Sequence, residues 1–572
     1  MTMTNPAETY DVVVIGSGAG GLSAALTAAV SGLSVAVFEK SEFVGGSTAV
    51  SGGAVWIPGN RLMEGVGCHD SRAAVRAYLA ATLGKRLKTD IIEAFLENGP
   101  EMVDFMAANT QVKFAARSLS PDYQSEVTGA AMGGRTIDPL PFDARLLGRN
   151  FNKLRPPLRS FMVLGGMMVN TKDIKALLNA FSSVSDFAHS TRLVLKYAID
   201  RLRHRRGTRL LLGNALAARL YRSALDRNIP ILTGVTAGDL VLDNGKVVGV
   251  NVDVQGQVRI IAARVGVVLA TGGFPANVSE RANFMPNADN HRTMAPADNV
   301  GEGISMALRA GARMEVGNKG AALWAPISRL TMPDGKERLC PHLIIDRQKP
   351  GLIAVDQKGK RFVNEATAYH EFVEAMHGNP DAVPAFLICD AVFLRRYGLG
   401  LVRAKYDLPR PFVRAGYLLT AQTLGALADV LGIDRNNLAE AVAGMNEAAD
   451  TGVDLVFGKG STRYNQYLGD PDHKPNPCLG PISTAPFYAV KVWPGDIGTA
   501  TGLVVDDHAR VLNGANQPVD GLFACGNDMN SIMAGSYPAA GITLGPALTF
   551  GYIAGRTLAQ AATSEKRQAT NS

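Results

Sequence analysis

The feature that most constrains the fold is a glycine-rich turn between a β-branched run and a helix of small residues. The segment DVVVIGSGAGGLSAALTAAVSGLSVAVFEK (residues 11–40) carries GxGxxG at Gly16, Gly18 and Gly21. The first two glycines permit a tight turn and close approach of a pyrophosphate, and the third lets helix and strand pack. The helix N-terminus attracts phosphate, and Glu39 ends the second strand, where an acid accepts hydrogen bonds from a ribose. We interpret the segment as a dinucleotide-binding βαβ unit.

Three further segments indicate that the dinucleotide is FAD. VGVVLATGGF (265–274) and DGLFACGND (520–528) each predict a strand that ends in a glycine turn, and GGSTAVSGGAVW (45–56) follows the first βαβ unit. This late return to the nucleotide fold resembles FAD proteins of the glutathione-reductase-like class, in which a glycine-rich segment meets the flavin. Relatives that attach FAD covalently use a histidine in that segment; none is present, so we expect non-covalent FAD and no metal. The residues expected to bind FAD are Gly16, Ser17, Gly18, Gly20, Gly21, Glu39, Lys40, Gly46, Ser47, Thr48, Gly52, Gly53, Val235, Ala270, Thr271, Gly272, Gly526, Asn527, Ile542 and Leu544.

The predicted fold class is α/β (α+β), with a discontinuous Rossmann-like FAD-binding domain and an inserted catalytic domain. A chain of 572 residues exceeds the usual size of one domain. The FAD-binding domain is expected at 1–275 and 481–572, and the catalytic domain at 276–480. Residues 236–268 alternate in polarity around DNGK and VQGQ turns, which predicts a β-meander.

Composition indicates the compartment and excludes some partners. The five cysteines are far apart with no CxxC, which favours reduced thiols over a disulfide framework or zinc site. The opening MTMTNPAETYDVVVIG lacks a basic region before an apolar core, so we expect no signal peptide and a cytoplasmic protein. A net charge of +7 is moderate and does not indicate nucleic acid.

One stretch, residues 180–212, departs from a minimal flavoprotein because it combines apolar and basic side chains. Such an amphipathic insertion is typical of a helix that lies on an anionic membrane, here the inner face of the cell membrane. The alternative is a solvated helix whose arginine stems cover apolar surface. The basic residues are Arg192, Lys196, Arg201, Arg203, Arg205, Arg206 and Arg209.

The order of four segments, GSGAGG, GGSTAVSGGAVW, GKRFVNEATAY and GSYPAAGITLGPALTFGYIAGR, resembles the fumarate reductase/succinate dehydrogenase flavoprotein superfamily over nearly the whole chain. Within it, SGGAVWIPGN, PDY, NExxxY and YPxxGxTLGPAxTFGYIAG are similar to the 3-ketosteroid Δ1-dehydrogenases. Those enzymes desaturate the C1–C2 bond of a 3-ketosteroid with FAD as hydride acceptor. The resemblance implies the same activity here.

Two positions distinguish this chain from the fumarate reductases, which hold two carboxylates with arginine and histidine. Tyr369 stands five residues after Asn364, where those enzymes place a catalytic arginine, and GSYPAAG lacks the arginine of their C-terminal loop. A dicarboxylate would meet too little fixed positive charge at these two places. A neutral ketone is the better match.

The resemblance also implies four catalytic residues. Tyr369 is the base for the C2 proton, and Tyr123 in PDY assists as a proton relay. The Tyr537 hydroxyl and the Gly541 N–H donate to the C3 carbonyl as an oxyanion hole. The alternative for each tyrosine is a packing role, and we expect Tyr464, Tyr467 and Tyr488 to be structural, with Tyr488 near the substrate cleft.

Three other functions stay open. A 3-ketosteroid Δ4-(5α)-dehydrogenase shares fold and ketone, a fumarate-reductase-like enzyme would reduce an enoate, and a non-catalytic electron-transfer flavoprotein would use the tyrosines only for packing. The flavin hydride must leave, and no iron–sulfur or haem ligand motif is evident in the sequence, so a quinone is the expected electron acceptor.

Overall fold

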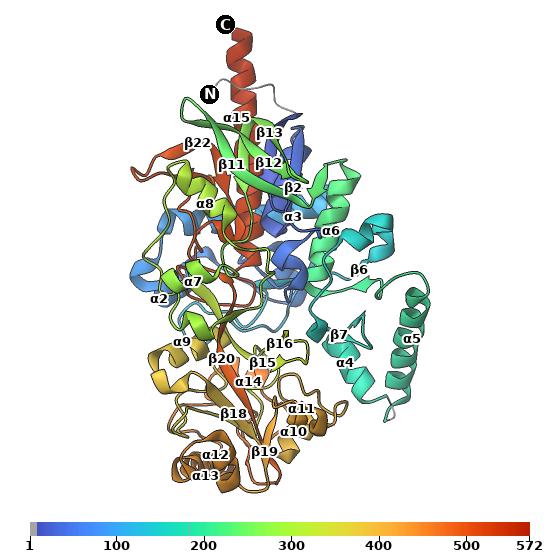
Figure 1. Ribbon diagram of the computed structural model, residues 1–572, viewed down its shortest axis with the longest axis vertical. Coiled ribbons are helices and arrows are strands. Elements are labelled where there is room, and N and C mark those ends of the chain that lie inside the picture. The colour runs from blue at the N-terminus through green and yellow to red at the C-terminus, as the bar shows by residue number, and fades with distance from the viewer. Residues whose placement is uncertain (1–7, 181, 572) are drawn as a thin grey trace.

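The structure, a computed structural model, describes residues 8–180 and 182–571 (Figure 1). Residues 1–7, on which part of the signal-peptide prediction falls, lie outside the described residues. All five cysteines are free thiols, as the sequence predicts. Within the described ranges, no helix has both the length and the apolar character needed to cross a membrane.

The first sheet forms the nucleotide-binding part of the molecule. Its order is β10-β2-β1-β13-β12-β11, and β22 pairs with the end of β13 on the edge opposite β1. The β10, β2, β1, β13 and β22 pairings are parallel, whereas β13, β12 and β11 form the antiparallel meander that the sequence predicts. The strands are β1 (Glu8–Ile15), β2 (Val35–Glu39), β10 (Ile231–Thr233), β11 (Val235–Asp243), β12 (Lys246–Val254), β13 (Gln257–Leu269), β21 (Arg510–Leu512) and β22 (Pro518–Ala524).

Two helices of small residues pack together beside this sheet, α1 (Ala19–Val30) and the C-terminal α15 (Leu544–Asn571). Central parallel strands are buried on both faces, which explains the continuous β-branched run in β1. A Cβ at Gly551 would lie 2.3 Å from the carbonyl oxygen of Gly20, so the two helices approach too closely for any larger residue. Figure 1 shows α15 running through this part of the molecule.

The second sheet belongs to the segment between the two halves of the first. Its order is β16-β15-β20-β18-β17, with β14 and β19 also paired to β20. β20 (Phe487–Thr499) lies in this sheet, although the boundary expected at residue 481 assigns it to the FAD-binding domain. β20 belongs to the second sheet because its hydrogen-bonded neighbours, β15 and β18, come from the chain's middle segment. The other strands are β14 (Arg292–Thr293), β15 (Ala322–Thr331), β16 (Glu337–Pro341), β17 (Leu352–Val355), β18 (Ala385–Cys389) and β19 (Leu419–Ala421).

A lobe of short elements projects from the side of the molecule (Figure 1). It contains β7 (Met162–Val163), β8 (Met167–Met168), α4 (Thr171–Leu178) and α5 (Val184–Arg201). The predicted insertion 180–212 therefore contains one exposed helix, α5. The C-terminal end of the predicted insertion is not part of this exposed helix. Leu210 is buried in β9 (Arg209–Leu210), and Leu212 begins the mostly buried α6 (Leu212–Asp226).

The remaining elements connect these parts. They are β3 (Val55–Trp56), α2 (Arg72–Leu83), α3 (Thr89–Asn109), β4 (Phe114–Ala116), β5 (Thr136–Pro139), β6 (Phe142–Asp143), α7 (Val278–Phe284), α8 (Glu302–Arg309), α9 (Tyr369–Gly378), α10 (Ala391–Tyr397), α11 (Pro409–Arg414), α12 (Leu424–Leu431), α13 (Arg435–Thr451) and α14 (Arg463–Leu468).

Candidate active site

A cavity of about 1270 Å³ is lined by the nucleotide-binding turns, the second sheet and the projecting lobe. A single small ligand typically occupies a pocket of about 300–1,000 Å³. The cavity therefore has room for a dinucleotide and a second molecule beside it.

Eighteen of the twenty residues expected to bind FAD line this cavity; Gly21 and Ile542 do not. A Cβ at Gly21 would lie 2.1 Å from the Gly16 carbonyl oxygen, which agrees with the packing role of the third glycine. Ile542 borders a separate small pocket next to Asn527, so the structure does not support a cavity contact for it. Glu39 is buried, and its carboxylate accepts hydrogen bonds from Ser17 N–H (3.0 Å) and Ser17 Oγ (2.5 Å).

The glycines along the cavity wall fit a bulky bound group. A Cβ at Gly52 or Gly526 would meet no protein atom within 4 Å, and one at Gly18 only Thr48 Oγ1 at 3.9 Å. The protein thus leaves open space where side chains would otherwise project into the cavity. The Thr48 Oγ1 atom also accepts the Ala19 N–H at 2.9 Å, which fixes the start of α1. These residues would hold FAD, which supplies a hydride acceptor when bound.

A buried carboxylate organises the turn after β13. Asp528 accepts hydrogen bonds from the N–H groups of Thr271 and Gly273 and from Thr271 Oγ1. Burial raises the pKa of Asp528 above its ordinary value, although these hydrogen bonds oppose the shift. The sequence predicts a glycine turn at DGLFACGND but gives this acid no distinct role.

The three tyrosines expected to be catalytic meet in the wall of the cavity. The hydroxyl oxygens of Tyr123 and Tyr369 lie 3.2 Å apart. The Tyr123 and Tyr537 rings stack at 5.6 Å, and the Tyr369 ring meets that of Tyr537 edge-on at 5.1 Å. All three side chains line the cavity and are at most 7% exposed. The cluster joins segments that are far apart in sequence.

Burial sets the protonation of this cluster. It raises the pKa of Tyr369 and Tyr123 well above 10, and neighbouring tyrosines add to both shifts. Burial also raises the pKa of Tyr537 to about 12, against hydrogen bonds with Tyr369 and Thr543. Near neutral pH all three are phenols, so Tyr537 can donate a hydrogen bond.

Tyr369 is the first residue of α9, and a buried arginine holds the turn before it. Arg347 is fully buried and donates hydrogen bonds to the carbonyls of Glu365 (2.8 Å) and Thr367 (3.2 Å). Glu365 in turn pairs with Arg361 at 2.8 Å. This network fixes the backbone that presents the Tyr369 hydroxyl.

Gly541 adopts a conformation that only glycine takes readily. Its φ is +98°, and a Cβ would lie 2.6 Å from Trp56 N. The Gly541 carbonyl accepts the Trp56 N–H at 3.1 Å. Within the described residues its own N–H has no hydrogen-bond acceptor, and the residue lines the cavity. The preceding loop is anchored where Tyr78 donates its hydroxyl to Pro538 O at 2.6 Å.

Several residues of the cavity wall are not expected there from the sequence. Tyr464 and Tyr467, expected to be structural, line the cavity, and the Tyr464 ring lies 4.7 Å from that of Tyr123. Tyr488 does not line it. No motif marks the charged residues of the wall, so the sequence offered no local signal for them. Apart from Glu39 and the ion pairs Lys40–Glu302 and Arg155–Asp298, they are Arg117, Asp138, Arg159, Arg338 and Arg403.

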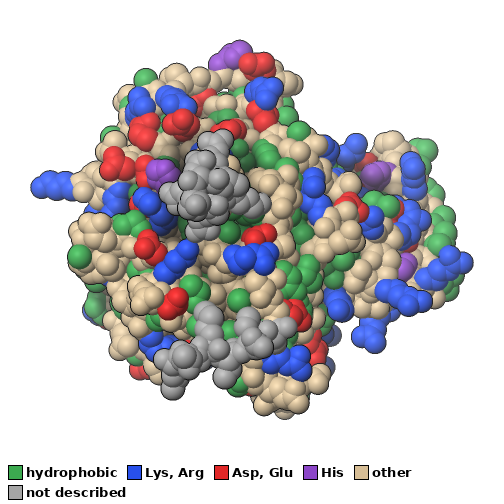
Figure 2. Space-filling model, turned by 90° about the horizontal axis from the view of Figure 1, so that it is seen from above, with side chains coloured by type: hydrophobic (Ala, Val, Ile, Leu, Met, Phe, Trp, Pro, Cys, Tyr) green, Lys and Arg blue, Asp and Glu red, His purple; other side chains and the backbone are tan. Residues whose placement is uncertain are grey.

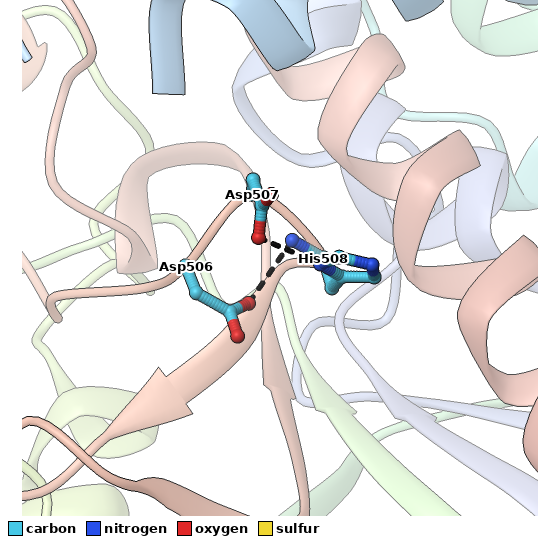
Figure 3. Close-up of side chains that lie close together, drawn as sticks. All are labelled: Asp506, Asp507 and His508. Carbon is cyan, nitrogen blue, oxygen red and sulfur yellow. Dashed lines mark hydrogen bonds and ion pairs between the residues drawn. The ribbon is translucent and has the colours of Figure 1, made fainter. Parts of the chain in front are cut away.

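One group of potential metal ligands occurs in the described part of the chain (Figure 3). Asp506, Asp507 and His508 lie on the turn before β21, away from the cavity wall. Asp507 already pairs with His508 Nδ1 at 2.6 Å, and Asp506 with Arg510 at 2.7 Å. The group is part of the turn's own hydrogen bonding and is not joined to the tyrosine cluster.

Comparisons with known proteins identify the family to which this chain belongs. The family described as FAD binding domain matches residues 11–544. The chain is 38% identical to 4-oxocyclohex-2-ene-1-carboxylate 5-dehydrogenase of Sinomonas cyclohexanicum, covering 97% of this chain and 95% of that protein. It is 34% identical to 3-oxosteroid 1-dehydrogenase of Mycolicibacterium smegmatis, over 98% and 99% of the two chains.

A solved structure is similar over almost the whole chain. It is the 3-ketosteroid Δ1-dehydrogenase of Sterolibacterium denitrificans in complex with 1,4-androstadiene-3,17-dione, with a TM-score of 0.89 and 37% identity. The likeness covers 97% of this chain and 100% of that one. The chain therefore belongs to the FAD binding domain family of flavoproteins, in the group that includes the 3-oxosteroid 1-dehydrogenases, and is an FAD-dependent oxidoreductase.

Proposed function

We propose that this chain catalyses the FAD-dependent 1,2-desaturation of 3-ketosteroids. The observation that carries the proposal is the combination of three buried phenols and an unpaired Gly541 N–H in the cavity that the nucleotide-binding turns also line. Two neutral donors, the Tyr537 hydroxyl and the Gly541 N–H, match a ketone oxygen. The hydroxyl group of Tyr369 can act as the base when it is deprotonated. A non-catalytic flavoprotein would not need an amide held free beside a tyrosine cluster.

Each residue then has a distinct task. Tyr537 O–H and Gly541 N–H polarise the C3 ketone and stabilise the enolate oxygen that develops. Tyr369 takes the C2 proton in its phenolate form, a small fraction at neutral pH, and Tyr123, whose hydroxyl lies 3.2 Å away, relays the proton so gained toward solvent. Burial of the cluster excludes water from the developing charge and strengthens these interactions. The loss of hydride from C1 completes the double bond.

Two finer alternatives share this machinery. A Δ4-(5α)-dehydrogenase would place C4 and C5 near Tyr369. Desaturation of a compact cyclic keto acid is the second, because the relative at 38% identity is named for such a substrate. Enoate reduction is disfavoured because Tyr369 stands where fumarate reductases place a catalytic arginine and GSYPAAG lacks the arginine of their C-terminal loop.

Anaerobic flavin bleaching tests the proposal. Mixing the yellow holoenzyme with androst-4-ene-3,17-dione is expected to bleach the flavin rapidly and yield a 1,4-diene, identified by mass spectrometry and NMR. A 4-ene product from a saturated steroid would establish Δ4 chemistry instead. If 4-oxocyclohex-2-ene-1-carboxylate bleaches the flavin and the steroid does not, the substrate would be a cyclic keto acid. If neither compound bleaches the flavin, the result contradicts desaturation of cyclic ketones.

We infer that a quinone reoxidises the flavin, because no metal-cluster motif in the sequence offers another route for the electrons. Adding a water-soluble quinone to the bleached enzyme should restore the yellow colour. Reoxidation by oxygen alone, at a rate that matches turnover, would argue against a quinone.

We also propose that the lobe makes peripheral contact with an anionic bilayer, such as the inner face of the cell membrane. Figure 2 shows basic side chains gathered on the lobe with hydrophobic ones between them. Arg206 and Arg209 are not part of this surface, because Arg206 stacks on Phe151 and Arg209 pairs with Asp173. The exposed hydrophobic residues are Val184, Phe187, Val194, Leu195, Ile199 and Leu202, and the exposed basic ones are Arg192, Lys196, Arg201, Arg203 and Arg205.

Vesicle binding tests this surface. Replacing Leu195 and Ile199, which are 59% and 66% exposed, by aspartate should weaken binding to phosphatidylserine vesicles at least tenfold. Burial of each apolar side chain is worth about 1.5–3 kcal/mol, and about 1.4 kcal/mol is tenfold in affinity. The matched control places aspartate at Leu455 and Val456, two apolar residues outside the lobe that are even more exposed, at 92% and 75%. Equal binding by both variants, or none by the parent protein, contradicts the proposal.

A further inference from the structure

The charges along the cavity are unevenly distributed. At the nucleotide end, Lys40 pairs with Glu302, and Arg155 pairs with Asp298. The rest of the wall carries four arginines but one acid, as described above. Asp138 is the one acid among these lining residues, so the lining itself does not balance the charge of the four guanidinium groups.

Two of the four arginines are neutralised by acids. Arg117 binds Asp138 through two nitrogens, each at 2.7 Å. Burial opposes the charge on Arg117, but Asp138 raises its pKa above the ordinary value, so the pair is ionised. Arg403 binds Asp407 through two nitrogens at 3.0 Å. These pairs leave no net charge.

Arg159 and Arg338 are the exceptions. Neither makes an ion pair or a side-chain hydrogen bond with any residue in 8–180 or 182–571. Asp407 is near Arg338, but Arg403 already holds both of its oxygens. Arg159 precedes β7 of the lobe and Arg338 belongs to β16, so two separate elements bring the two arginines to one cavity.

The surroundings of these arginines are apolar. Leu158 and Met162 line the cavity beside Arg159, and Ile344 and Ile345 line it close to Arg338 in sequence while remaining exposed. Both arginines are themselves exposed, which places them at the rim. The same cavity is lined by the neutral phenols of the tyrosine cluster. It therefore combines a neutral cluster that suits a ketone with a basic rim flanked by apolar side chains.

We propose that this cavity selects cyclic ketones that carry a carboxylate remote from the ketone, with Arg159 and Arg338 binding the carboxylate. The inference rests on the proposed function and specifies its substrate class. Arginine matches a carboxylate with two parallel hydrogen bonds, and an uncompensated cation at a rim also steers anions inward. The carboxylate belongs either to a steroid with an acidic side chain or to a compact keto acid.

Matched acids and esters test the proposal. The substrates are 3-oxochol-4-en-24-oic acid and 4-oxocyclohex-2-ene-1-carboxylate, each compared with its methyl ester. At low ionic strength kcat/KM should favour the acid by about tenfold, mainly through KM. This preference should shrink as salt rises, because exposed charges are screened. If the steroid acid is preferred over its ester, the carboxylate belongs to a steroid side chain. If 4-oxocyclohex-2-ene-1-carboxylate is preferred over its ester, it belongs to a compact keto acid.

R338Q and R159Q should each lower kcat/KM for the acid several-fold and change that for the ester much less. R414Q is the control, because Arg414 is an exposed arginine on α11 outside the cavity wall. Flavin absorbance confirms that each variant retains FAD. Equal use of acid and ester by the parent enzyme, or an unchanged ratio in both rim variants, overturns the inference while desaturation stands. Failure to bleach with acids, esters and androst-4-ene-3,17-dione contradicts the proposed function instead.

Discussion

Replacing Tyr369 by phenylalanine should slow substrate-dependent flavin reduction by about 10²–10⁴-fold, the usual contribution of a general base. The change removes one hydroxyl, which lies 3.2 Å from that of Tyr123, and leaves the ring contacts with Tyr537 in place. FAD content and thermal stability should therefore remain near those of the parent enzyme. Anaerobic stopped-flow absorbance measures the rate.

The pH profile separates a base from a packing residue. Because burial holds the pKa of Tyr369 well above 10, only a small fraction is phenolate at neutral pH. That fraction grows as pH rises, so the reduction rate should increase between pH 7 and about 10, the ordinary pKa of tyrosine. Y369F should lack this increase.

Tyr488 provides the control for Tyr369. It is a buried tyrosine of the second sheet that does not line the cavity, so Y488F should keep both the rate and its pH dependence. If the reduction rate of the parent enzyme does not change with pH, or if the rate of Y369F is within threefold of the parent rate, the base is another group.

Replacing Tyr537 by phenylalanine should lower the reduction rate by about 100–1000-fold, the typical effect of losing one oxyanion-hole donor. Burial raises the pKa of Tyr537 to about 12, so the parent side chain is a neutral donor throughout the working range. The Gly541 N–H remains in the variant and accounts for the residual activity. Single-turnover bleaching with a saturating ketone measures the effect on chemistry apart from binding.

The two tyrosine variants should differ in one respect. Y537F retains Tyr369 and should keep the rise of rate with pH, at a uniformly lower level. Loss of the pH dependence in Y537F as well would mean that the two phenols titrate as one unit. A variant that binds FAD normally and reduces it at the parent rate would remove Tyr537 from the oxyanion hole.

The nucleotide half of the cavity could be predicted well because its signals are local. Gly16, Gly18 and Gly21 specify a turn by their backbone freedom and lack of a side chain, and neighbours in sequence complete the βαβ unit. Ile542 shows the limit of that reasoning. Its position after Gly541 suggested a backbone contact with flavin, but the residue lines a separate small pocket and not the large cavity.

The substrate half could be predicted only in part. The family resemblance named Tyr123, Tyr369 and Tyr537, yet nothing in the local sequence says that hydroxyls 246 residues apart lie within hydrogen-bond reach. The rim arginines had no motif at all. Arg159 and Arg338 share a cavity because a projecting lobe and an edge strand of the second sheet lie on either side of it.

The sequence by itself determined the dinucleotide turn, the meander and the glycine at 541, because backbone conformation at each depends on residue type and immediate neighbours. Only the tertiary structure decided that β20 joins the second sheet, that Tyr464 and Tyr467 face the cavity, and that Arg117 is neutralised while Arg338 is not. Those outcomes depend on which distant side chains pack together. Burial and charge pairing belong to such contacts, so they appear only when the chain is folded.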